Sequence, residues 1–331
     1  MVVITTHLVT HSGVRDIFIT EEDKFALVAT FGGIDVVNLH TGNVVSSGIL
    51  PGGYLPLCIT ADWTTSSGLI YVGTSGGGIF STRYHFARTP GSDFSGSLTA
   101  HYSTATPTPT SSDVIRDLAM KDGKLFAATS SGVDVIYVRN NRKATRALAS
   151  GAFGVHLTSS GGGYWTTTDS VEVKYDLLSS TGTGIIGTDF AYTVTSVPQL
   201  PGPGVFDMAV SEAIVGTALV FATPSGVLVT EEEPFVESTA QSKIFTPPNE
   251  TEENPSPLFI SVDFSPRAAF NSGLLYATTT GTLRVYDLSD NTLVGTHPQA
   301  FESVYNFTGG IARDQLLATG IVNIVRTTAV P

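Results

Sequence analysis

A sequence unit that recurs about every 48 residues is the strongest constraint on how this chain can fold. Each copy reads as a strand starting near an acidic residue, an apolar strand ending in Ala or Gly followed by Thr, a Gly-rich turn, and an alternating strand. In the seven copies this turn is marked by Gly33, Gly78, Gly132, Ser170, Gly226, Gly281 and Gly320. Self-similar units of roughly 40–50 residues built from short strands are typical of ring-shaped repeat folds.

The residue pattern within a unit explains why the copies must pack on one another. The second strand is nearly all apolar, as in the run 25–29, and the third alternates, as in Ile34-Asp35-Val36-Val37. A strand covered on both faces needs neighbours on both sides, which one unit alone cannot supply. The sequence therefore predicts an all-β single domain over residues 1–331, a seven-bladed β-propeller with four-stranded antiparallel blades.

The two ends of the chain predict how the ring closes. The seventh copy supplies three strands before Pro331, while residues 2–9 form a spare strand ahead of the first copy. We expect residues 2–9 to be the outer strand of the last blade, because this pairing closes the ring and covers an open sheet edge. The alternative is a six-bladed ring, in which the degenerate fourth copy, residues 151–176, is an insertion.

The copies resemble the LVIVD and YVTN groups of β-propeller repeats. The resemblance is carried by Val14-Arg15-Asp16-Ile17 with Gly33-Ile34-Asp35-Val36-Val37, and by Leu274-Leu275-Tyr276-Ala277 with Leu283-Arg284-Val285-Tyr286-Asp287. It implies the propeller fold but no particular activity, since such repeats serve many roles. The Gly-His and Trp-Asp pairs typical of WD repeats are missing, so the partners of that subgroup are not implied.

Composition limits the partners. The chain carries 17 Lys and Arg against 29 Asp and Glu, a net charge of −12, and has no basic run, so nucleic acid is not an expected partner. No apolar stretch is long enough to predict a membrane span, and the N-terminus lacks the features of a signal peptide. The lone cysteine, Cys58, lies in an apolar run and is predicted to be a buried small side chain.

Acidic residues near the start of the first strand of several copies are the only candidate metal ligands. An acid stands at an equivalent place in four copies, as Asp16, Asp117, Asp207 and Asp263, with His156 and Asn306 near this place in two other copies. A ring of carboxylates around the axis could bind a hard cation such as Ca²⁺. The competing interpretation, which we favour, is that each Asp caps its strand or binds the backbone of the neighbouring blade. Arg15 and Arg116 precede two of these acids and are expected to pair with an adjoining blade.

Three long connections interrupt the regular spacing, over residues 86–112, 179–204 and 231–257. Long loops on a rigid scaffold often carry binding residues. The candidate partner-binding residues in them are Tyr102, Pro107, Pro109, Pro201, Pro248 and Glu252. Unconstrained variation in connecting segments is the alternative explanation of their length.

No catalytic motif and no cofactor site is predicted, so a non-enzymatic role is favoured. Charged residues make up only 14% of the chain, and Thr, Ser and Gly fill the polar positions. This composition predicts a rigid disc that binds other proteins or a surface ligand such as a glycan within a larger assembly, for example as a phage tail or capsid-surface component of a virion. The expected location is a virion or the cytoplasm, with extracellular exposure left open. The alternatives are an enzyme or metal-binding propeller with an axial carboxylate site, and an extracytoplasmic sensor propeller.

Overall fold

The computed structural model describes most of the repeated strands and part of the connections between them. It covers residues 2–8, 14–20, 25–38, 43–50, 53–62, 67–76, 78–85, 103–104, 114–121, 123–138, 142–147, 151–157, 162–166, 171–176, 191–196, 207–211, 218–223, 225–231, 242–245, 259–264, 268–279, 283–297, 301–308, 314–320 and 323–329. Within these ranges every named element is a β-strand. None of the described segments is a helix long and apolar enough to cross a membrane.

The described strands form seven four-stranded antiparallel sheets, which we number along the chain. Sheet 1 holds β2 (Val14–Ile19), β3 (Phe25–Thr30), β4 (Gly33–Asn38) and β5 (Val44–Gly48). Sheet 2 holds β6 (Pro56–Asp62), β7 (Ser67–Thr74), β8 (Ile79–His85) and β9 (Ser103–Thr104). Sheet 3 holds β10 (Ile115–Lys121), β11 (Lys124–Thr129), β12 (Gly132–Tyr137) and β13 (Arg142–Ala147). Sheet 4 holds β14 (Gly154–Leu157), β15 (Gly162–Thr166), β16 (Val171–Asp176) and β17 (Ala191–Ser196).

The remaining three sheets follow the same order, except that the last one combines both ends of the chain. Sheet 5 holds β18 (Asp207–Val210), β19 (Ala218–Thr223), β20 (Gly226–Glu231) and β21 (Ser242–Phe245). Sheet 6 holds β22 (Phe259–Phe264), β23 (Leu274–Thr279), β24 (Leu283–Asp287) and β25 (Thr292–His297). Sheet 7 holds β26 (Phe301–Thr308), β27 (Asp314–Gly320), β28 (Asn323–Ala329) and β1 (Val2–Leu8).

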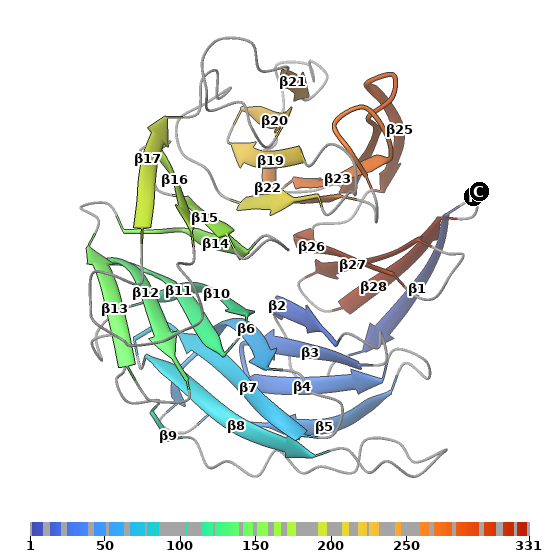
Figure 1. Cartoon of the computed structure of the whole chain (residues 1–331). Coiled ribbons are helices and arrows are strands. Elements are labelled where there is room, and N and C mark those ends of the chain that lie inside the picture. The colour runs from blue at the N-terminus through green and yellow to red at the C-terminus, as the bar shows by residue number, and fades with distance from the viewer. Residues whose placement is uncertain are drawn as a thin grey trace.

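The sheets stand side by side around a common centre, with the first strand of each sheet innermost (Figure 1). Each inner strand contacts that of the next sheet, from β2 and β6 through to β22 and β26, and β26 also contacts β2. In sheet 7, β1 pairs antiparallel with β28 over its whole length, from Val2 opposite Ala329 to Leu8 opposite Asn323. The degenerate fourth copy forms a sheet of its own, and the three long connections each contain one outer strand, β9, β17 or β21.

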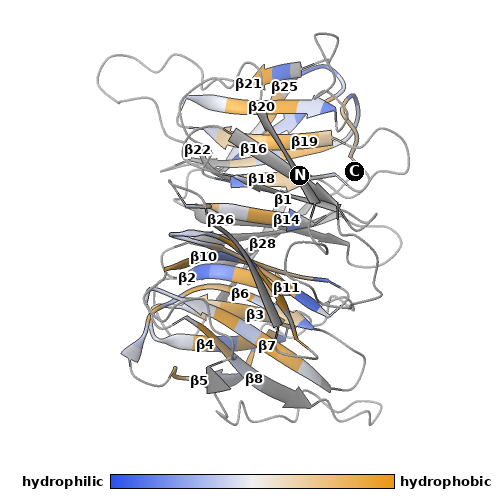
Figure 2. Cartoon of the chain, turned by 60° about the vertical axis from the view of Figure 1, so that its left-hand side comes forward, coloured by the Kyte–Doolittle hydropathy of each residue, from blue (hydrophilic) through white to orange (hydrophobic). Residues whose placement is uncertain are grey.

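The apolar second strands fill the space between neighbouring sheets. Every residue of β3, β11 and β19 is buried, and apolar residues concentrate within strands such as β19 and β20 (Figure 2). Leu27, Val36, Ile59 and Val72 belong to one cluster between sheets 1 and 2. Burying one such side chain contributes about 1.5–3 kcal/mol, so the contacts between sheets, which no sheet can make alone, dominate the stability.

The recurrent Thr and Gly of the repeat belong to one hydrogen-bonded turn. The Thr30 hydroxyl donates to the carbonyl of Gly33 at 2.9 Å. Thr129 and Thr223 bind Gly132 and Gly226 in the same way, at 3.1 and 2.7 Å. A Cβ on Gly33 would lie 2.0 Å from the carbonyl oxygen of Gly48, so this close approach requires glycine.

The antiparallel order places three features of each sheet on the same side of the ring. These are the start of the inner strand, the turn between the second and third strands, and the linker that arrives from the preceding sheet. We call this side the linker face. In sheets 1 and 2 it includes the turn at Phe31 and the linker residues 49–50 and 53–55.

Candidate functional site

Asp16 joins sheet 1 to sheet 2 through its carboxylate. One oxygen, Oδ1, accepts the N–H of Ile17 at 2.8 Å, and the other, Oδ2, accepts the N–H of Ile59 on β6 at 2.7 Å. Asp16 is buried, as are Ile17 and Ile59. A carboxylate that accepts two backbone N–H groups satisfies donors that would otherwise be buried without partners.

The same arrangement recurs at two further junctions. Asp117 accepts the N–H of Leu118 and, from β14 of sheet 4, the N–H of Val155, both at 2.8 Å. Asp207 accepts the N–H of Met208 at 2.9 Å and that of Val262 on β22 at 3.1 Å. Asp16, Asp117 and Asp207 therefore join sheet 1 to 2, sheet 3 to 4 and sheet 5 to 6, which agrees with the interpretation that each Asp binds its neighbour's backbone.

The pairing register corrects the predicted equivalence of Asp263. Asp16, Asp117 and Asp207 lie opposite Ala29, Ala128 and Ala222, each just before the Thr that ends its strand. In sheet 6 the residue at this position is Ser261, opposite Thr278, and Asp263 lies two residues further along β22. The sequence comparison placed Asp263 here because it used the acidic residue as the marker of the position, and in sheet 6 a Ser stands at the position while the Asp lies two residues later. In sheet 7 Ser303, and not Asn306, takes the position.

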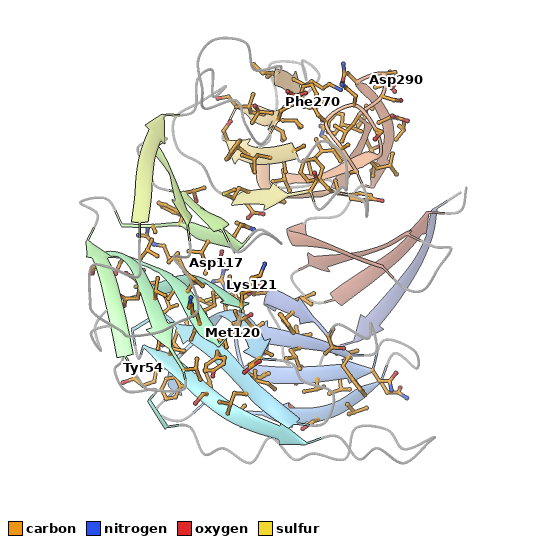
Figure 3. All side chains as sticks on the ribbon, viewed as in Figure 1. Tyr54, Asp117, Met120, Lys121, Phe270 and Asp290 are labelled. Carbon is orange, nitrogen blue, oxygen red and sulfur yellow. The ribbon has the colours of Figure 1, made fainter. Side chains whose placement is uncertain are left out.

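Asp117 and Asp207 lie close to His156 near the inner ends of sheets 3 to 5. The His156 Nε2 atom is 3.8 Å from Oδ1 of Asp207, and Figure 3 shows Asp117 near the middle of the ring. Burial raises the pKa of Asp117 to about 6, and the charge of Asp207 adds to this, while His156 and the N–H groups of Val155 and Leu118 oppose it. The described residues contain no group of three His, Cys, Asp or Glu side chains arranged to hold a metal ion.

Cys58 occupies the Asp position in sheet 2 and joins sheets 2 and 3 by apolar packing and by one hydrogen bond of its thiol. It lies opposite Gly73, and its S–H donates to the carbonyl of Ile115, with Sγ 3.6 Å from the oxygen. Burial, with smaller contributions from the charges of Asp117 and Asp16, raises the pKa of the thiol well above its usual value. The thiol is therefore protonated at neutral pH, which suits packing and not nucleophilic chemistry.

Arg15 and Arg116 project from the same position of their inner strands and stack on phenylalanine rings. The guanidinium carbon of Arg15 lies 4.3 Å from the centre of the Phe31 ring, and that of Arg116 lies 4.2 Å from the Phe153 ring. Arg116 also donates to the carbonyl of Ala152 at 3.2 Å. As predicted, Arg116 pairs with the adjoining sheet through the linker at residues 151–153. Arg15 differs, because its ring belongs to its own sheet.

Four large apolar side chains are exposed on the linker face of sheets 1 and 2. We call them the apolar patch: Phe31, Ile49, Tyr54 and Leu55, which are 40%, 71%, 42% and 41% exposed. The linker is fixed in place, because Leu50 is buried and the N–H of Ser75 donates to the carbonyl of Leu55 at 3.1 Å. Tyr54 also packs on Phe80, with ring centres 5.7 Å apart, and Figure 3 shows Tyr54 well away from Asp117. Several large apolar side chains exposed on one face of a molecule are typical of a binding site.

Sequence reasoning did not single out the apolar patch. The signal that could have indicated it is the apolar content of the linker around Pro51-Gly52-Gly53, because loops usually carry polar residues. The residues that it did propose for partner binding, Tyr102, Pro107, Pro109, Pro201, Pro248 and Glu252, lie outside the described residues. The strand of Asp263 is described, but its side chain is not.

Comparisons with known proteins identify the fold. No protein-family model matches the chain, and no curated protein matches it in sequence. The structure is similar to that of the RRP9 WD40 repeats, with a TM-score of 0.70 and 13% identity over 99% of this chain and 97% of that one. It is also similar to the structure of U3-55K, with a TM-score of 0.69 and 13% identity over 99% of this chain and 98% of that one. At this identity the likeness concerns the fold alone, and the chain is a β-propeller repeat protein.

Proposed function

We propose that this chain is a non-enzymatic protein-interaction module, a seven-bladed propeller closed by its N-terminal strand that binds a partner through its linker face. The observation that carries the proposal is the apolar patch of Phe31, Ile49, Tyr54 and Leu55. These side chains are exposed to water, although the described linker residues are anchored at two points, by the buried Leu50 and by the hydrogen bond from Ser75 to Leu55. Exposed apolar groups on a rigid surface favour association, because the partner does not have to order them on binding.

The arrangement of the sheets supports the seven-bladed ring in this proposal. The described strands form seven sheets, and the contact between β26 and β2 brings the last sheet beside the first. The pairing of β1 with β28 gives sheet 7 a strand from the opposite end of the chain. A ring joined in this way has no free sheet face, which makes it a stiff support for a binding surface.

The acids near the axis support a structural role and not a catalytic one. Both oxygens of Asp16, Asp117 and Asp207 accept backbone N–H groups, one from the same strand and one from the next sheet. A general base or nucleophile needs lone pairs directed at a substrate. Each of the three carboxylates is held by one N–H group of its own strand and one of the next sheet, which favours a role in joining neighbouring sheets.

A finer version of the proposal places the chain in a multi-protein particle such as a virion, where it would be exposed on a tail or capsid surface. Its support is compositional: only 14% of residues are charged, and Thr, Ser and Gly dominate the polar positions. Purified particles from the source would then contain the chain at a fixed ratio to their major protein. Its absence from every such particle would contradict this version.

The proposal is tested by comparing two matched surface variants as baits. In the first, Ile49 and Leu55 of the apolar patch are replaced by Ser. In the second, Ile244 and Val294, which are also exposed but lie on the outer strands β21 and β25, are replaced by Ser. We expect proteins retained from an extract of the source by the wild-type chain to be retained by the second variant and lost with the first. Equal retention by all three baits would contradict the proposal.

A further inference from the structure

Arg15 places a cation at the edge of the apolar patch. Its guanidinium carbon lies 4.3 Å from the centre of the Phe31 ring, so charge and apolar surface meet on the linker face. Arginine stacked on an aromatic ring keeps its edge N–H groups free to bind a planar acceptor such as a carboxylate. Cation and ring together therefore present both an apolar contact and hydrogen-bond donors.

Arg15 has no acidic partner among the residues that the structure describes. The Arg15 Nε atom is buried and has no hydrogen-bond acceptor within that part of the chain. The carboxylate of the adjacent Asp16 is directed at the N–H groups of Ile17 and Ile59. The described residues therefore leave the charge of Arg15 uncompensated, although the residue as a whole is only half-buried.

Arg116 repeats the stacking of Arg15 two sheets further on, in sheet 3. It stacks on Phe153 and donates one N–H to the carbonyl of Ala152. The inner strand β6 contacts both β2 and β10, so the two arginines lie on either side of the strand that Tyr54 and Leu55 lead into. Burial lowers the pKa of Arg116, as expected for a cation that would gain from a nearby anion.

We propose that the linker face binds an acidic segment of a partner protein, and this inference rests on the proposed function. Aliphatic or aromatic side chains of the segment would cover Ile49, Tyr54 and Leu55, and its carboxylates would bind Arg15 and Arg116. The whole chain carries a net charge of −12, so its overall field disfavours an acidic partner, and Arg15 and Arg116 supply the local attraction that such a segment needs.

The test uses two short fluorescent peptides whose anisotropy reports binding to the full chain. One peptide has two central Phe residues flanked by Glu, and the other has Lys in place of every Glu. We expect the Glu peptide to bind the wild-type chain, to bind more weakly as NaCl is raised, and to bind better than the Lys peptide. Replacing Arg15 and Arg116 by Gln should weaken its binding at least about tenfold, because charge-assisted hydrogen bonds to carboxylates are lost.

Lys243→Gln is the matched control, since Lys243 also lies over an aromatic ring, Phe270 at 4.8 Å, but belongs to sheet 5. This variant should bind the Glu peptide as the wild type does. Equal binding of the Lys peptide, or unchanged binding after the arginine replacements, would overturn the acidic partner. In that case the bait experiment decides whether the proposed function survives. If the variant with Ser at positions 49 and 55 no longer retains the proteins that the wild-type chain retains from the extract, the proposed function stands without the acidic partner. If this variant retains them, the proposed function fails as well.

Discussion

The inner strands and the apolar patch lie on the same propeller but use their side chains in opposite ways. At the inner strands, Asp16 is buried and both of its oxygens accept backbone N–H groups. On the linker face, Ile49 is 71% exposed although its neighbour Leu50 is buried in the core between sheets 1 and 2. The acidic side chain, which is the type expected at a chemical site, binds backbone groups within the fold. The apolar side chain of the patch is the one that is exposed to a partner.

This difference shows where function can reside on a repeat scaffold. A residue type that recurs at the same position, as Asp does in sheets 1, 3 and 5, is explained by the contact that it makes with the backbone of the next sheet. Phe31, Ile49, Tyr54 and Leu55 instead occur in one pair of neighbouring sheets and follow no repeat. Features specific to one place on a repeat fold are the better candidates for binding.

Replacing Asp16 by Ala should produce the largest loss of stability. The substitution leaves the buried N–H groups of Ile17 and Ile59 without an acceptor, which should cost about 2–5 kcal/mol in the free energy of unfolding. Urea unfolding followed by tryptophan fluorescence measures this value. A loss below about 0.5 kcal/mol would mean that the carboxylate does not join the sheets.

Gly73→Ala tests the apolar junction that replaces the carboxylate in sheet 2. The new Cβ would lie 2.4 Å from Sγ of Cys58 and 2.5 Å from Cγ2 of Ile115, and such overpacking should cost about 1–3 kcal/mol. Gly295→Ala is the control, because its Cβ would meet no atom closer than 3.9 Å. Equal free energies of unfolding for the two variants would show that sheets 2 and 3 are not packed as described.

The free energy of unfolding should depend on pH through the carboxyl of Asp117, and the Asp117→Asn variant should lack this contribution. Burial raises the pKa of this carboxyl from 3.8 to about 6 in the folded chain, so between these values the folded state binds more protons than the unfolded state. The free energy of unfolding of the wild type, relative to the variant, should therefore fall as pH rises through this window and stay level above it. A difference that stays constant or rises with pH would contradict the raised pKa.

Replacing Ile49 and Leu55 by Ser should have the smallest effect on stability. Both side chains are exposed on the linker face, so the free energy of unfolding should change by no more than about 0.5 kcal/mol for each. Thermal unfolding of this variant beside the wild type checks the value. A large loss would show that the two side chains serve the fold, and the contrast with Asp16 would disappear.

The sequence predicted the repeat but not its exact register. Apolar second strands and the Thr–Gly turns have a strong periodic pattern, which is why residues 25–30 and 33–38 were recognised directly. The outer strands β9, β17 and β21 were not separated from the long connections, because a strand packed on one side only needs few apolar residues. Asp263 was misaligned because an acidic residue was taken as the marker of the position, whereas in sheet 6 the position holds Ser261.

The candidate site was predicted only in part, for a physical reason. Asp16, Asp117 and Asp207 were found because their spacing follows the repeat. The patch was missed because the exposure of Ile49 beside a buried Leu50 depends on how the linker turns, and a linker has no period from which to predict it.

The most direct test of the central claim is the thermal unfolding midpoint, measured in EDTA and in millimolar Ca²⁺ for the wild type and for a variant with Asp16, Asp117 and Asp207 all replaced by Asn. If these carboxylates serve to join neighbouring sheets, the wild type should unfold at the same temperature in both solutions. The variant should unfold at a much lower temperature in both. A wild type that Ca²⁺ stabilises, beside a variant that it does not, would show instead that the acids form an axial cation site.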